Sequence, residues 1–318
     1  MTQRTPINRK PRVLVLGGYG FIGRHIVKEL EGLGADVVIG TRKKPTTPNE
    51  CQFILHKLGS NEQWHSELEN IDVLINTVGI LRQRWGESYQ QVHHLAVKQL
   101  ANACEQQGIR LIHISALGLN NAVKSRFLTS KLAGEHALVN SKADWFLVRP
   151  SLVDGVGGFG ARWFERVATW PIHFIPTSAK ALINPITAHE LGLAVAKIAF
   201  LGSEARPEAS RIYQLGGTKV LTLIEYLNLL KLRKLKLKKL KLKKLKRTIN
   251  NTAKAKQALI VRVPSVLARL LSHVCDLLHI TPFSFGHYEL LKFDNVAQPN
   301  RLDEVLQDKY LSCKCKCT

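Results

Sequence analysis

Short, almost wholly apolar runs alternate with amphipathic stretches through the first half of the chain. The apolar runs predict buried strands, which begin at Arg12 and then cover residues 35–42, 52–55, 71–79, 111–116 and 145–150. Helical spacing of apolar residues predicts helices between them, after Gly23 and over residues 60–68, 92–107 and 129–140. Strands that are apolar throughout and alternate with helices indicate an α/β fold with a Rossmann-like, doubly wound parallel sheet.

A cluster of glycines joins the first strand to the first helix. Gly17, Gly20 and Gly23 have the spacing G-x-x-G-x-x-G, between a Val/Leu strand and an amphipathic helix. A pyrophosphate can approach the backbone closely at a helix N-terminus, where unpaired N–H groups attract anions and only glycine leaves room. The turn is therefore predicted to bind a nicotinamide dinucleotide through these glycines, Phe21 and Ile22.

The end of the second strand is basic. Arg42, Lys43 and Lys44 stand there, and the first acidic residue that follows is Glu50. A free ribose 2′-hydroxyl usually meets a carboxylate at this point, whereas a 2′-phosphate requires cations. The sequence therefore favours NADP(H) over NAD(H), with Arg42 on the phosphate, although a basic run beside a surface turn is also common without any such role.

The second half of the chain is predicted to form a smaller lobe. The expected division is a dinucleotide-binding core over residues 1–150 and a substrate or partner lobe over residues 151–318. A glycine-containing loop over residues 151–160 should cap the cofactor. Residues 182–196 read as a strand that enters a helix capped by Thr187, and residues 212–217 as a strand that returns to the sheet.

Half of the excess positive charge lies in one segment of this lobe. The chain has 318 residues and a formal net charge of +22, and residues 231–247, called here the Lys/Leu repeat, hold eleven Lys and Arg and no acidic residue. Its five-residue period gives no clean apolar stripe as a helix or as a strand. Three interpretations compete: a membrane or nucleic-acid arm, a long basic helix, and, favoured here, an expanded repeat that replaces an ordinary helix and loop.

Composition excludes several classes of protein. No apolar run reaches the roughly 20 residues of a membrane-spanning helix, and residues 1–10 are too polar for a secretory signal. Six cysteines without a C-x-x-C pair do not suggest a disulfide scaffold, and the tail Cys313, Cys315 and Cys317 offers three thiols without a fourth ligand. No metal site is predicted, and the expected location is the cytoplasm or the periphery of the inner membrane.

Several segments resemble the extended and atypical short-chain dehydrogenase/reductases. They are residues 17–23, 76–81, 113–118, 130–135 and 149–151. More narrowly, the chain resembles the nucleotide-binding accessory subunit of respiratory complex I and its bacterial relatives, over about residues 10–230 and again near 263–296. The resemblance implies a Rossmann-like core and a bound NAD(P).

The same resemblance locates a catalytic tyrosine four residues before a lysine, and here the pattern is broken. Lys131 is present, but Phe127 stands in the tyrosine position, and a phenyl ring cannot transfer a proton. The serine expected on the preceding strand aligns with Ala116, one position beyond Ser115. Tyr89 belongs to a different helix. The nearby alcohols Ser125, Thr129 and Ser130 are poor proton donors unless another group activates them.

The histidines in this region are interpreted as structural residues and not as catalytic ones. His93 and His94 follow Tyr89 on the helix that flanks the predicted cleft, and His113 lies within a buried strand. All three are interpreted as structural residues. Lys131 is assigned to the nicotinamide ribose. Because the lysine is present and the tyrosine is not, cofactor binding is expected without the usual hydride transfer.

The sequence therefore predicts a cofactor-stabilised structural, assembly or sensing protein. Its predicted partners are a respiratory or other protein complex and an anionic membrane surface. No specific nucleic acid is expected to bind. One alternative is an active reductase, epimerase or isomerase with a non-standard proton donor. A second alternative is a peripheral membrane or polyanion binder that acts through the Lys/Leu repeat.

Overall fold

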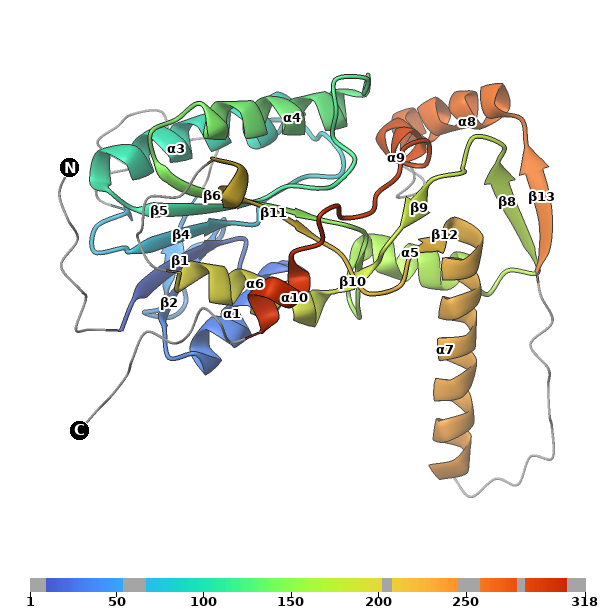
Figure 1. Ribbon diagram of the computed structural model, residues 1–318, viewed down its shortest axis with the longest axis horizontal. Coiled ribbons are helices and arrows are strands. Elements are labelled where there is room, and N and C mark those ends of the chain that lie inside the picture. The colour runs from blue at the N-terminus through green and yellow to red at the C-terminus, as the bar shows by residue number, and fades with distance from the viewer. Residues whose placement is uncertain (1–9, 54–66, 202–207, 245–257, 279–283, 308–318) are drawn as a thin grey trace.

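Seven parallel strands form the central sheet of the computed structural model, which describes residues 10–53, 67–201, 208–244, 258–278 and 284–307 (Figure 1). The strands are β1 (Arg12–Leu16), β2 (Asp36–Thr41), β3 (Glu50–Gln52), β4 (Val73–Asn76), β5 (Arg110–Ile114), β6 (Asp144–Pro150) and β11 (Ile212–Leu215). Their order is β11-β6-β5-β4-β1-β2-β3. The order reverses between β1 and β4, which is where this kind of sheet binds dinucleotides. The predicted Rossmann-like α/β class is confirmed.

Helices cover both faces of the sheet and bury two separate apolar layers (Figure 1). One face carries α3 (Ala96–Gln107) and α4 (Arg126–Val139). The other carries α1 (Gly23–Gly32), α6 (Ala188–Ala199) and the short α10 (Leu302–Leu306). Helices α1 and α6 touch closely, because a side chain at Gly192 would lie 2.9 Å from the carbonyl carbon of His25. The strands are therefore buried on both faces, as their continuous apolar runs require.

The predicted helix boundaries differ from the structure in two places that matter for the site. The helix expected over residues 92–107 begins as a π-helical turn, η1 (Gln90–Leu95), before α3. Helix α4 begins three residues earlier than predicted, because the Ser125 hydroxyl accepts a hydrogen bond from the Leu128 amide at 3.3 Å and caps it. The predicted helix over residues 60–68 lies almost entirely outside the described residues.

The predicted cap of α6 is present. Thr187 and Glu190 form a reciprocal capping box, in which the Glu190 amide donates to the Thr187 hydroxyl at 3.1 Å and the Thr187 amide donates to the Glu190 carboxylate at 3.0 Å. Residues 212–215 return to the sheet as β11, parallel to β6. Elements from the second half of the chain thus complete the core formed by the first.

The C-terminal lobe consists of short strand pairs and helices around a small core. The pairs are β7 (Val153–Asp154) with β10 (Ile186–Thr187), β8 (Ile172–Pro176) with β13 (Leu259–Val263), and β9 (Leu182–Ile183) with β12 (Leu221–Thr222). The helical elements are α5 (Phe159–Val167), η2 (Glu208–Arg211), α7 (Leu223–Lys244), α8 (Ser265–Leu278) and α9 (Phe285–Leu290). Tyr226, Leu227 and Leu230 of α7 fill the core against Ile175 and Ile183.

Most of the Lys/Leu repeat is helical. Helix α7 continues without a break to Lys244 and extends away from the body of the protein (Figure 1). Its first turns bury Leu227 and Leu230, whereas Leu232 and Leu237 are exposed. Within the described residues no helix is both long and apolar enough to cross a membrane.

Candidate functional site

The glycine turn between β1 and α1 has the geometry of an anion-binding site. Gly17 has a φ of +77°, which favours glycine, and a side chain there would lie 2.8 Å from the Thr77 hydroxyl. Side chains at Gly20 and Gly23 would lie 2.9 and 2.2 Å from the Gly17 carbonyl oxygen. Each predicted glycine is therefore required by the turn itself, and the space that they leave lies at the N-terminus of α1, the kind of position that attracts phosphates in other proteins.

A second loop closes over this turn. A side chain at Gly158 would lie 2.7 Å from the Phe21 ring, and Gly157, with a φ of +95°, lies against the Arg24 guanidinium. Arg24 also donates to the Val156 carbonyl oxygen, and its guanidinium lies 5.6 Å from the centre of the Phe21 ring. The loop over residues 151–160 thus packs on the predicted cofactor turn through Phe21.

Carboxylates approach the end of β2 from two directions. The Arg42 guanidinium pairs with Glu87 at 2.8 Å, and Glu50 accepts hydrogen bonds from the Tyr19 hydroxyl and, at 2.7 Å, from the Thr46 amide. The hydrogen bonds from Tyr19 and Thr46 lower the pKa of Glu50, and the bond from the Tyr19 hydroxyl has the larger effect. Arg42 is well exposed and lies where it was predicted, but sequence reasoning missed its partner Glu87, which lies 45 residues away.

Phe127 lies within a cluster of aromatic rings. Its ring meets those of Tyr89 and His93 edge-on, with 5.6 Å between ring centres, and stacks on His287 at 5.9 Å. The Phe127 side chain is 9% exposed, and the Lys131 ammonium lies 5.8 Å from the centre of its ring. Lys131 and Phe127 are thus brought together as predicted, but aromatic side chains surround the position of the missing phenol.

The hydroxyl groups nearest to Phe127 all have hydrogen-bond partners. Thr129 donates to the Ser125 carbonyl oxygen at 3.0 Å, and Ser130 donates to the Phe127 carbonyl oxygen at 2.9 Å. The Tyr89 hydroxyl donates to the Leu81 carbonyl oxygen at 2.9 Å, and burial raises its pKa. These contacts, with Ser125 at the cap of α4, make each of them a poorer substitute for the absent tyrosine.

His93 is held neutral by a chain of hydrogen bonds. Its Nε2 accepts from the Ile80 amide at 3.0 Å, so Nδ1 carries the proton and donates to the Ser130 hydroxyl at 3.1 Å. Burial, with smaller contributions from Lys131 and His113, lowers the pKa of His93 to about 2. The π-helical turn η1 carries His93, and a side chain at Gly134 would lie 2.0 Å from the His93 carbonyl oxygen. Gly134 therefore lets α4 approach η1 closely.

Beneath this cluster lie three further polar groups. The Asn76 amide nitrogen donates to His113 Nδ1 at 3.2 Å, and the Asn76 carbonyl oxygen accepts from the Val78 amide at 3.0 Å. Burial, with a smaller contribution from Lys131, lowers the pKa of His113 to about 3. The buried Ser115 hydroxyl finds no hydrogen-bond partner among the described residues. Ala116, which aligns with the expected serine, is only partly buried.

The short helix α9 covers the Phe127 cluster from the C-terminal lobe. The Glu289 carboxylate accepts from the amides of Lys124 and Ser125, the latter at 2.7 Å, and is buried. A side chain at Gly286 would lie 2.9 Å from the Phe127 ring. Sequence reasoning missed α9 because about 160 residues separate it from the segment that it contacts.

Lys131 lies deep in this arrangement. Burial lowers its pKa, and the nearby Glu135 carboxylate partly offsets that effect. Glu135 itself pairs with Arg149 at 2.5 Å. A side chain at Gly79, which ends the segment after β4, would lie 3.7 Å from the Lys131 amine. Lys131 therefore lies beside Gly79, in the segment that follows the carboxyl end of β4.

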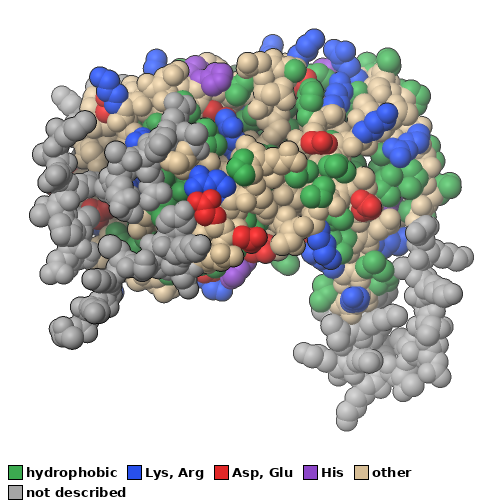
Figure 2. All heavy atoms as spheres, in the orientation of Figure 1, with side chains coloured by type: hydrophobic (Ala, Val, Ile, Leu, Met, Phe, Trp, Pro, Cys, Tyr) green, Lys and Arg blue, Asp and Glu red, His purple; other side chains and the backbone are tan. Residues whose placement is uncertain are grey.

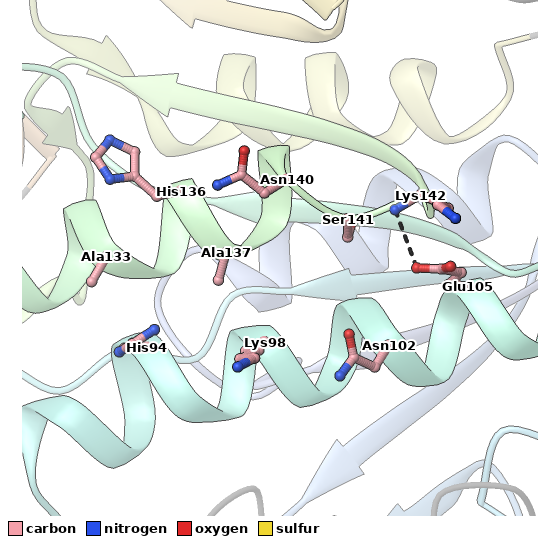
Figure 3. A pocket seen from close by; sticks show the side chains of 10 residues that line it. All are labelled: His94, Lys98, Asn102, Glu105, Ala133, His136, Ala137, Asn140, Ser141 and Lys142. Atoms are coloured by element: carbon pink, nitrogen blue, oxygen red, sulfur yellow. Dashed lines mark hydrogen bonds between the residues drawn. The ribbon is translucent and has the colours of Figure 1, made fainter.

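An open pocket of about 570 Å³ lies between α3 and α4, on the outer surface of these helices (Figure 3). It is lined mainly by polar side chains, including His94, Lys98, His136 and Lys142. The Lys142 amide donates to Glu105 at 3.1 Å across one end. None of the predicted cofactor residues lines it, and His94 is the one residue singled out from the sequence that does.

Comparison with known proteins agrees with this geometry. Residues 17–157 match a family model described as NAD(P)H-binding. The chain is 23% identical over 234 residues to a mitochondrial protein of Arabidopsis thaliana named NADH dehydrogenase [ubiquinone] 1 alpha subcomplex subunit 9, covering 68% of this chain and 56% of the relative. It is 28% identical over 149 residues to a Caulobacter vibrioides ceramide reductase, covering 46% of this chain and 47% of the relative. The chain thus spans about half the length of these curated relatives.

Solved structures show the same fold at low sequence identity. MoeE5 in complex with UDP-glucuronic acid and NAD aligns with a TM-score of 0.57 at 18% identity, covering 93% of this chain and 92% of that one. The chain resembles the extended short-chain dehydrogenase/reductases in fold. A dTDP-glucose 4,6-dehydratase from Bacillus anthracis, in complex with NAD, aligns with a TM-score of 0.57 at 13% identity, covering 80% of this chain and 84% of that one. The predicted resemblance to complex I subunits is confirmed.

Proposed function

We propose that this protein is an atypical short-chain dehydrogenase/reductase that holds a nicotinamide dinucleotide as a structural or sensing element and does not perform tyrosine-dependent hydride transfer. The observation that carries the proposal is the Phe127 ring, which is buried among Tyr89, His93 and His287 in the position of the proton donor. A phenyl ring has no proton to exchange with a substrate oxygen. The hydroxyls around it are already committed to backbone carbonyls or to a helix cap.

The residues proposed to hold the cofactor come from both halves of the cleft. Gly17, Gly20 and Gly23 would take the pyrophosphate, with Phe21 and Ile22 beside it at the start of α1. Lys131 would hold the nicotinamide ribose, and Arg42 would take the 2′-phosphate of NADP(H) in preference to NAD(H). The bound cofactor could supply a hydride, but the proposed role of these side chains is to bind and orient it.

The proposed setting of this role follows the relatives. Proteins whose names place them in a mitochondrial NADH dehydrogenase complex match 68% of this chain. We therefore infer that the chain acts within, or in the assembly of, a respiratory or other protein complex, in the cytoplasm or at the periphery of the inner membrane. A bound dinucleotide would stabilise the cleft that joins the two lobes, because a ligand stabilises the state that binds it.

The test measures binding and turnover separately. Purified protein is titrated with NADPH and NADH by nucleotide fluorescence, and its unfolding temperature is recorded with each. At a hundredfold excess over the dissociation constant, a bound dinucleotide should add about 3 kcal/mol to the free energy of unfolding. Lys131→Met should weaken binding roughly tenfold by removing a charge-assisted hydrogen bond. Absence of binding to both nucleotides would overturn the proposal.

A working reductase or epimerase is the second candidate, and two observations favour it: the buried Ser115 hydroxyl has no partner among the described residues, and Lys131 is present. Purified protein is therefore incubated with NADPH or NADH and with quinone, ketone, aldehyde and nucleotide-sugar substrates. We expect cofactor oxidation no faster than without substrate. Oxidation that depends on a substrate and disappears in Lys131→Met would establish the enzyme instead.

A further inference from the structure

Helix α8 has the reverse of the pattern expected of a helix in a globular protein. The two residues that it buries are small, Ala268 and Ser272. Its large apolar side chains are exposed: Val266 82%, Leu267 47%, Leu270 60%, Leu271 50%, Val274 42%, Leu277 78% and Leu278 55%. A surface helix normally turns its apolar stripe to the core and its polar residues to water. The part of the chain that the structure describes therefore leaves the outer stripe of α8 uncovered, and an exposed apolar stripe of this size marks an interaction surface.

The exposed apolar surface continues beyond α8 onto the adjoining strands. Strand β13 leads into α8 and exposes Leu259 and Val261 on the same side of the ribbon as Ile172 and Phe174 of its partner β8. We call the surface formed by these four side chains and the outer stripe of α8 the apolar face. Figure 1 shows the three elements together at one end of the molecule, and Figure 2 shows hydrophobic and basic side chains gathered there.

The charge around the apolar face is positive. Within residues 259–278 the cations Arg262 and Arg269 are exposed, and the single carboxylate, Asp276, pairs with Arg82. Helix α7 of the same lobe adds the Lys/Leu repeat, whose described side chains include the exposed Lys234 and Lys236. Apolar side chains flanked by Lys and Arg are typical of surfaces that enter the headgroup region of an anionic bilayer.

We propose that the apolar face docks this protein on an anionic lipid bilayer, with the side chains of α8 inserted at the level of the headgroups and the cations against lipid phosphates. This proposal is independent of whether the cofactor site turns over. Helix α8 has 14 residues, too few to span the hydrocarbon core, so it lies in the plane of the interface. A second copy is a poorer occupant, because it would bring the same positive charge to the interface.

The experiment uses the full chain and vesicles of two compositions. Co-sedimentation at physiological salt compares pure phosphatidylcholine with phosphatidylcholine containing phosphatidylglycerol. We expect binding to the anionic vesicles and at least ~10-fold weaker binding to the neutral ones. The variant Val266→Asp, Leu270→Asp and Leu277→Asp should lose at least ~10-fold in affinity for anionic vesicles. Trp85→Asp, at a fully exposed aromatic outside this lobe, is the matched control and should bind like wild type.

A variant that binds more tightly than wild type provides a further test, because stronger binding cannot result from a failure to fold. Leu277→Trp should bind anionic vesicles several-fold more tightly, with blue-shifted emission, because tryptophan prefers the membrane interface. Three outcomes would overturn the proposal. In the first, wild type binds neither kind of vesicle. In the second, the triple variant still binds, whereas deletion of residues 231–247 abolishes binding; in the third, wild type forms a concentration-dependent dimer in solution and the triple variant is monomeric.

Discussion

The glycine turn and the Phe127 cluster lie at the same edge of one sheet but differ in the space that they leave for a ligand. In the turn, Gly17, Gly20 and Gly23 each occupy a position where a side chain would collide with the turn or with the segment after β4. In the cluster, Phe127 has no hydroxyl, and α9 packs its Gly286 against the ring. The turn therefore leaves space at the N-terminus of α1, whereas aromatic rings fill the surroundings of Phe127.

This difference teaches that cofactor binding and proton transfer depend on separate structural features. The geometry of the turn depends only on backbone conformation, so the seven residues from Gly17 to Gly23 determine it. The cluster depends on contacts among η1, α4 and α9, and its histidines are neutral because burial disfavours their charged form. The two halves can be tested separately by changes that affect one and leave the other intact.

The largest effect is expected at the turn. Gly23→Ala places a methyl group 2.2 Å from the Gly17 carbonyl oxygen, so the turn must open. We expect a loss of about 3 kcal/mol in the free energy of unfolding and more than roughly tenfold in dinucleotide affinity. Urea unfolding and nucleotide fluorescence measure both.

The matched control for Gly23→Ala lies in the same helix. No atom lies within 4 Å of a side chain built at Gly32, so Gly32→Ala should leave affinity unchanged and stability equal or slightly higher. Equal losses in the two variants would show that the turn is not specially constrained.

Acid should destabilise the cluster side of the cleft. His93 and His113 have folded pKa values of about 2 and about 3, below their ordinary value of 6.5, so the unfolded chain binds more protons once the pH falls below 6.5. Stability is therefore complete above this pH and is lost as the pH falls toward the folded values. Between pH 7 and pH 5 we expect each histidine to cost up to about 2 kcal/mol.

Urea unfolding at several pH values checks this dependence. His93→Gln should lower stability at pH 7 but reduce the slope of stability against pH by about one proton between pH 6 and pH 4. A free energy of unfolding that does not change between pH 7 and pH 5 would contradict the assignment of neutral, buried histidines.

Cofactor choice should respond to the pair at the end of β2. Arg42→Glu removes the proposed phosphate contact and should weaken NADPH binding about tenfold or more with a much smaller effect on NADH. Glu87→Gln releases Arg42 from its ion pair and should strengthen NADPH binding a few-fold. Parallel titrations of the two nucleotides measure the ratio, and an unchanged ratio in both variants would remove Arg42 from the site.

The smallest effect is expected at Ser115. Its buried hydroxyl has no partner among the described residues, so Ser115→Ala should leave the stability of the free protein equal or raise it by up to about 1 kcal/mol. If the hydroxyl faces a bound molecule, the same change should weaken dinucleotide affinity. Thermal unfolding with and without NADPH separates the two cases. A loss of stability in both conditions would show that the hydroxyl has a structural partner.

Local sequence determined the parts of this protein that depend on neighbouring residues. The glycine spacing, the buried strands, the Thr187 cap and the replacement of tyrosine by Phe127 can all be read over a few positions, because backbone sterics, helix capping and proton chemistry act at that range. The same local rules gave no periodic signal for the Lys/Leu repeat, which is nevertheless helical as far as Lys244.

Only the tertiary structure decided how distant segments complete the site. Glu87 pairs with Arg42, Gly134 allows η1 to approach α4 closely, and α9 contacts Phe127 from about 160 residues away. Because these contacts join segments that are distant in sequence, no local pattern predicts them. The same holds for α8, because local sequence does not specify which face of this helix is buried. Periodicity specifies that a helix has an apolar side, and only packing specifies that this side faces outward.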